Sequence, residues 1–164
     1  MVFEYLVKFL NSQASTSIAG FLILFVSIIA IYYHRKTAKE RFTFECLRQL
    51  DTDIILINAQ NLLQTIHFDN RVSLELIATS EEIKHKKLKQ ELRHLLNYFE
   101  SLAIGCKIGI YDKRTIILSS NQQIINTYKY SLPYIKMLRK ELKNRNIFVN
   151  LESFAQELQK LNNK

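Results

Sequence analysis

Residues 17–33 read SIAGFLILFVSIIAIYY, a run without a charged side chain. With Ala14 to Thr16 before it, the uncharged stretch reaches about 20 residues, which is the length of helix that crosses the ~30 Å hydrocarbon core of a bilayer. A helix that is apolar on every side would need a large protein to cover it in water. The sequence therefore predicts a membrane-spanning helix over residues 13–34.

The charges that flank this run predict its orientation. The N-terminal side carries only Glu4 and Lys8, whereas basic residues crowd the C-terminal side. This asymmetry places the N-terminus outside and the rest of the chain in the cytoplasm. A cleaved signal peptide is not expected, because the preceding residues are not basic and no small-x-small site follows. The cations expected to contact anionic lipid are Arg35, Lys36, Lys39 and Arg41.

Residues 1–12 are predicted to form a short amphipathic helix. Its apolar residues share one face, and its charged residues lie elsewhere, which is the pattern of a helix at the headgroup boundary. Packing against a neighbouring copy of the chain is the alternative. The apolar face consists of Phe3, Leu6, Phe9 and Leu10.

A stripe of mostly small and polar residues follows one side of the predicted spanning helix, at alternating spacings of three and four. Such a stripe lets helices approach closely, or it faces water in a pore. Self-association, a pore and an ordinary single-pass anchor all remain open, although Ile23 within the stripe counts against the pore. The stripe consists of Gln13, Thr16, Gly20, Ile23, Ser27 and Ala30.

Residues 35–164 are predicted to form an all-α bundle of about four to six helices. The whole chain has three glycines and one proline, too few turn residues for a many-stranded sheet. Apolar spacing predicts helices over residues 72–79, 81–108, 132–143 and 150–161. Asp112 is the expected N-cap of a further helix, and Pro133 the first-turn residue of a new one. A cap or kink is expected at residues 51–53, and a turn at residues 68–71.

The charge balance favours anionic partners. Lys and Arg number 23 against 15 acidic residues, a formal net charge of +8. Lipid headgroups explain the basic stretch 34–41. The stretches 84–94 and 136–145 are either solvated helix faces or RNA contacts, and no aromatic stacking platform is expected beside them.

No cofactor, metal or enzymatic activity is predicted. The glycines form neither a GxGxxG nor a GKS loop, and the histidines form no HExxH motif. The two cysteines, Cys46 and Cys106, lack metal-ligand spacing and are interpreted as core side chains.

The run HLLNYFESLAIGCKIGIYDKRTI (residues 94–116) carries a resemblance, together with SLPYIKMLRKE and VNLESFAQEL downstream. It is similar to a bacterial family of membrane-anchored helical proteins without established chemistry. The likeness extends over residues 39–161, and its core is LNYFExxAxG followed by GIYD. This resemblance implies the architecture of the family, a membrane anchor with a helical domain, and no particular chemistry.

In size and layout the chain also resembles the small membrane accessory proteins encoded beside the RNA-targeting effectors of type VI-B CRISPR systems. Those proteins have one N-terminal span and a divergent HEPN-like domain, and they are associated with homo-oligomeric pores that strengthen antiphage defence. The resemblance implies a homo-oligomer in the bacterial inner membrane, with an RNA-guided effector as its functional partner. The alternatives are a membrane-tethered HEPN-type protein that binds or cleaves RNA, and a non-enzymatic scaffold.

The HEPN ribonuclease signature is an arginine, four to six residues and a histidine that acts on the RNA. No arginine stands at that distance before a histidine in this chain. Asn61 stands there before His67, so the resemblance implies a degenerate HEPN-like site at these two residues. An amide cannot supply the cationic charge, and cleavage of RNA is therefore not expected.

Overall fold

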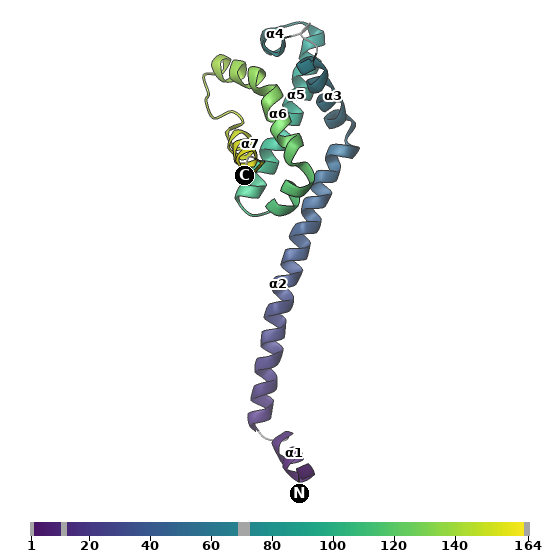
Figure 1. Cartoon of the computed structure of the whole chain (residues 1–164), viewed down its shortest axis with the longest axis vertical. Helices are drawn as coiled ribbons and strands as arrows, with labels where there is room; N and C mark the ends of the chain where they lie inside the picture. The colour runs from purple at the N-terminus through teal and green to yellow at the C-terminus, as the bar shows by residue number, and fades with distance from the viewer. Residues whose placement is uncertain (1, 11–12, 69–72, 163–164) are drawn as a thin grey trace. The chain divides into compact units, whose positions relative to one another are not determined.

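The fold is described by a computed structural model, which covers residues 2–10, 13–68 and 73–162 (Figure 1). These residues form helices and no strand, which confirms the all-α prediction. In chain order the helices are α1 (Val2–Leu10), α2 (Gln13–Thr52), α3 (Ile54–Phe68), α4 (Leu74–Thr79), α5 (Ile83–Lys107), α6 (Lys113–Glu141) and α7 (Val149–Asn162).

The chain divides into two compact units, Met1–Lys39 and Glu40–Lys164. The first unit contains α1 and the larger part of α2. The side chains of the predicted apolar face of α1, at Phe3, Leu6, Phe9 and Leu10, lie outside the described residues. The second unit contains the end of α2 and the five remaining helices.

Helix α5 is the central helix of the second unit, because it packs against α3, α6 and α7, while α4 packs on α6 and α5. The apolar face predicted for α5 is largely confirmed. Its nearly fully buried members are Leu92, Leu95, Leu96, Phe99 and Leu102. Ile83, an apolar residue within the predicted helix, is instead 87% exposed, because it is the first residue of α5 and precedes the packed turns.

Two predicted caps are present. The Asp112 carboxylate accepts a hydrogen bond from the Thr115 backbone N–H at 2.7 Å and begins α6. Asp53 separates α2 from α3, and its carboxylate accepts from the Ile55 N–H at 2.8 Å. Both carboxylates satisfy N–H groups that the first turn of a helix leaves unpaired.

The prediction that a new helix begins around Pro133 was wrong. Helix α6 runs without interruption from Lys113 to Glu141, with Pro133 inside it. Proline removes one hydrogen bond and disfavours the preceding turn, at a cost of about 3 kcal/mol. Burial of Tyr134, Ile135 and Leu138 just beyond the proline offsets this cost, since the same helix face continues into the core.

The smaller helix boundaries shift by a few residues. Ser80, which directly precedes the helix predicted over residues 81–108, is the C-cap of α4, and the N-cap of α5 is Glu82. The Ser80 hydroxyl still accepts from the Glu82 N–H at 3.2 Å. Phe68 ends α3, and the remainder of the turn predicted at residues 68–71 lies outside the described residues.

Candidate functional site

The apolar run forms the exposed part of α2. In the described part of the chain, one helix is long and apolar enough to cross a membrane, and it lies near the N-terminus. None of the residues in its most apolar window is buried. Large side chains such as Phe21, Leu24 and Phe25 are each at least 60% exposed. This surface is large and uncharged, and the first unit does not cover it.

The predicted stripe lies on this exposed helix. Thr16, Gly20, Ser27 and Ala30 are all exposed, and the side chain of Gln13 lies outside the described residues. A Cβ atom added at Gly20 would meet nothing within 4 Å. The Ser27 hydroxyl donates to the Ile23 carbonyl at 2.7 Å, so its polar group is satisfied within the helix. The Ser27 hydroxyl can therefore tolerate an apolar environment, and the surface at Gly20 is open.

The cations predicted to contact lipid follow the apolar run in the sequence. Arg35, Lys36 and Arg41 are exposed, and Lys39 is half-buried. Arg41 belongs to the second unit, and the other three belong to the first.

The two residues of the expected HEPN-like site lie on α3 with different neighbours. The Asn61 backbone carbonyl accepts from the Thr65 hydroxyl at 2.8 Å. The His67 ring stacks on Tyr130 of α6 with a centroid distance of 3.7 Å, and Phe68 meets both rings edge-on. His67 is therefore a member of an aromatic cluster that the sequence did not predict, because Tyr130 is distant in sequence from His67 and Phe68.

The motif residues that carried the family resemblance connect helices of the second unit. The Tyr98 hydroxyl on α5 donates to the Cys46 carbonyl on α2 at 2.5 Å, and it lies 3.5 Å from the Cys46 sulfur. Burial, followed by the hydrogen bond with Cys46, raises the pKa of Tyr98 above its usual value. The hydrogen bond with Cys46, followed by burial, raises the pKa of Tyr111 to about 12. Both phenols are therefore harder to ionise than a free tyrosine side chain.

The connection between α5 and α6 is fixed to α2 at a second point. The Asp112 backbone N–H donates to the Thr43 hydroxyl at 2.8 Å, and Thr43 is fully buried. The Tyr111 ring stacks on Phe42 with a centroid distance of 5.6 Å and lies against Gly105. The GIYD motif thus holds the end of α2 in the bundle.

A groove of about 510 Å³ borders this junction. Its lining includes Cys46, Tyr98 and Tyr111, and also His94, whose Nε2 lies 3.8 Å from Asp53 Oδ2. Among residues 2–10, 13–68 and 73–162, no group of three His, Cys, Asp or Glu side chains is placed to hold a metal ion.

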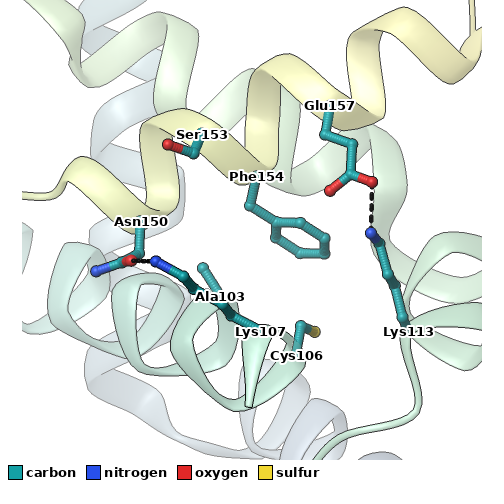
Figure 2. A pocket seen from close by; sticks show the side chains of 8 residues that line it. All are labelled: Ala103, Cys106, Lys107, Lys113, Asn150, Ser153, Phe154 and Glu157. Atoms are coloured by element: carbon teal, nitrogen blue, oxygen red, sulfur yellow. Dashed lines mark hydrogen bonds and ion pairs between the residues drawn. The ribbon is translucent and has the colours of Figure 1, made fainter. Parts of the chain in front are cut away.

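Figure 2 shows a second cavity, of about 350 Å³, where α5 and the start of α6 face α7. The Lys107 ammonium donates to the Asn150 side chain at 3.3 Å, and Lys113 forms an ion pair with Glu157. Cys106 lines the cavity and is half-buried, as is Cys46, so both cysteines, interpreted from the sequence as core side chains, pack against the core at its edge. Because α7 holds both lysines, this cavity is a packing junction between helices.

Comparison with known proteins identifies a family to which most of the chain is similar. A family model described as Domain of unknown function (DUF4760) matches residues 17–158. No curated protein and no solved structure matches the chain. The matched region begins in the apolar run and ends within α7, so it includes both the candidate membrane helix and the bundle.

Proposed function

This chain belongs to the family described as a domain of unknown function (DUF4760), and on that premise we propose that it is a single-pass membrane protein that self-associates through α2. The observation that carries the proposal is the apolar window of α2, in which no residue is buried. Removing one large apolar side chain from water is worth about 1.5–3 kcal/mol. A run of such side chains supplies a driving force on the order of 20 kcal/mol for entry into a bilayer.

The polar surface of the helix is compatible with this environment. A bilayer requires each polar group to be satisfied inside the protein, and the Ser27 hydroxyl meets that requirement through the Ile23 carbonyl. The open space around Gly20 allows close approach of a second helix. The stripe of Thr16, Gly20, Ser27 and Ala30 is the proposed contact between copies.

The proposed orientation has the N-terminus outside and the second unit in the cytoplasm, at a bacterial inner membrane. It is supported by the cations Arg35, Lys36, Lys39 and Arg41, which follow the apolar run, while Glu4 and Lys8 balance each other before it.

The proposed setting is antiphage defence, in which the oligomer opens a membrane pore that strengthens an RNA-guided, RNA-targeting CRISPR effector. Its support is the resemblance in size and layout to the type VI-B accessory proteins. The junction at Thr43 and Cys46 adds a physical argument. Its hydrogen bonds fix the end of α2 to the bundle, so a conformational change in the bundle would act on that helix.

The test is the size of the purified full chain in detergent. We expect the chain to resist alkaline carbonate extraction from membranes and to form a defined oligomer by light scattering. Gly20→Leu should shift it towards monomer, because the new side chain blocks close approach. Ile29→Phe adds bulk on the opposite face of the helix and serves as the matched control. A carbonate-soluble chain contradicts the membrane location, and a monomeric wild-type chain contradicts the self-association.

RNA binding is a second candidate function, favoured by the aromatic cluster of His67, Phe68 and Tyr130. Phe68 is 76% exposed, and the exposed cation Lys129 adjoins Tyr130 in sequence. Stacking of one base on an aromatic side chain contributes about 1–3 kcal/mol. Phe68→Ala should therefore weaken binding of labelled single-stranded RNA by about tenfold or more. Leu118→Ala, at another exposed apolar position, is the control. Equal RNA binding by both variants would show that the aromatic cluster does not contact RNA.

A further inference from the structure

The groove of about 510 Å³ that α2, α3 and α5 border together with Tyr111 combines an apolar floor with polar walls. Leu56 and Leu102 form the floor, and both belong to the buried core. A cavity of about 300–1,000 Å³ with an apolar lining and a few polar groups is the usual form of a small-molecule site. All of the lining residues belong to the second unit, so the groove lies within one compact part of the chain.

One carboxylate in the groove keeps an oxygen atom without a hydrogen-bond donor. Asp53 Oδ1 accepts from the Ile55 and Leu56 N–H groups, at 2.8 and 3.4 Å, and so caps α3. Among the described residues, none donates to Asp53 Oδ2, since the nitrogen that faces it, His94 Nε2, lies 3.8 Å away, beyond hydrogen-bond distance. The described lining contains no Lys or Arg that could pair with this oxygen. Asp53 Oδ2 is therefore available to a ligand.

The charge around the groove is negative, although the chain as a whole carries a formal net charge of +8. Burial is the largest cause of the raised pKa of Tyr98, and the charge of Asp51 adds to it, so a second carboxylate lies near the groove. The cation Arg48 lines an adjoining hollow of about 300 Å³, where Glu45 balances its charge. Because opposite charges attract, the groove favours a cationic ligand over an anionic one.

Neutral hydrogen-bonding side chains line the same groove. In the described part of the chain, no protein group bonds to the side chains of Gln49, Asn97 and Ser101, and each of them offers an oxygen acceptor. A primary ammonium group has three N–H donors and no acceptor, so it fits one carboxylate oxygen together with neutral oxygens. Tyr98 and Tyr111 add aromatic rings to the lining, and aromatic rings commonly line sites for organic cations.

We propose that this groove binds a small organic cation, namely a primary amine on a short aliphatic chain. The ammonium group donates to Asp53 Oδ2 and to the amide oxygens of Gln49 and Asn97. The alkyl chain packs on Leu56 and Leu102. Gln49 belongs to α2, Asp53 to the break before α3 and Asn97 to α5, so the ligand connects three helices of the second unit. The site needs neither a bilayer nor a second copy of the chain, and it therefore goes beyond the function proposed above.

The test is a titration of the full chain in detergent with butylamine, followed by NMR. The eight tyrosines are labelled with ¹³C, and single Tyr→Phe variants assign their ring signals. We expect the signals of Tyr98 and Tyr111 to shift and to saturate in the millimolar range, as suits so small a ligand. Tyr128 should not shift, because its hydroxyl donates to Glu152 at 2.7 Å and it does not line the groove.

Two variants test the proposed contacts. Asp53→Asn removes the negative charge and keeps a side-chain oxygen that caps α3, because Asn caps helices about as well as Asp. It should weaken butylamine binding at least tenfold. Asn97→Ala removes an acceptor without touching the cap and should weaken binding severalfold. Glu81→Gln neutralises an exposed carboxylate just before α5, outside the groove, and should leave the affinity unchanged.

An uncharged ligand of the same length completes the experiment. Butan-1-ol should not produce the saturable shifts, because it lacks the positive charge. Equal binding of the alcohol and the amine would overturn the proposal, as would the absence of a saturable shift at Tyr98 and Tyr111. Unchanged affinity in both Asp53→Asn and Asn97→Ala would show that butylamine binds elsewhere on the chain.

Discussion

Replacing Gly105 with alanine is expected to destabilise the second unit by about 3 kcal/mol, because overpacking of a fixed contact usually costs about 1–3 kcal/mol and occasionally more. The added Cβ would overlap two carbons of the Tyr111 ring. The ring must then leave its place, which breaks its stack on Phe42 and its contact with Cys46. Denaturant unfolding of the full chain in detergent, followed by circular dichroism, measures the change.

Gly109 provides the matched control. A Cβ there would meet nothing within 4 Å, so Gly109→Ala carries only the strain of a φ of 79°, about 1 kcal/mol. The decisive comparison is Gly105→Ala in a Tyr111→Ala background. With the ring removed, alanine should stabilise the helix by up to about 1 kcal/mol, since glycine is the poorer helix former. An equal loss in both backgrounds would show that the contact with Tyr111 is not the cause.

Replacing Glu100 with alanine is expected to cost a similar amount, about 3 kcal/mol, because charged hydrogen bonds contribute about 1.5–3 kcal/mol each. The Glu100 carboxylate on α5 accepts from the Leu151 N–H at 2.7 Å and from the Asn150 N–H at 3.2 Å, and so caps α7 from outside that helix. Its negative charge also faces the positive end of the α7 dipole.

The same unfolding measurement tests this cap. Glu100→Gln keeps a carbonyl oxygen and should lose less than Glu100→Ala. Glu45→Ala removes an exposed carboxylate from α2 and should remain within about 0.5 kcal/mol of wild type, as surface substitutions usually do. If Glu100→Ala is no worse than this control, α7 does not depend on the cap.

The helices were predictable because their apolar spacing and their caps are local signals. Asp112 shows this, since it precedes an apolar pattern and its carboxylate needs to reach only three residues ahead. Pro133 shows the opposite case. Its local signal is that of a helix start, and the burial of Tyr134 and Ile135, which depends on distant helices, outweighs that signal.

The roles of the motif residues could not be deduced from spacing. Tyr98 meets Cys46 across 52 positions, and Glu100 meets Leu151 across 51. The stack of His67 on Tyr130 is equally non-local, so the expected HEPN-like site gave no hint of its aromatic neighbour. The exposed α2 stripe differs, because its residues lie on one helix and helical periodicity alone brings them together.

The hydrogen bond between Thr43 and Asp112 sets an order of events during synthesis. The two residues are 69 positions apart, and at about 5–20 residues per second a ribosome needs roughly 3–14 s to make the second after the first. The apolar run precedes Thr43 and leaves the ribosome within that interval. In a membrane-inserted chain, the apolar run therefore enters the bilayer before the hydrogen bond that attaches the end of α2 to the bundle can form.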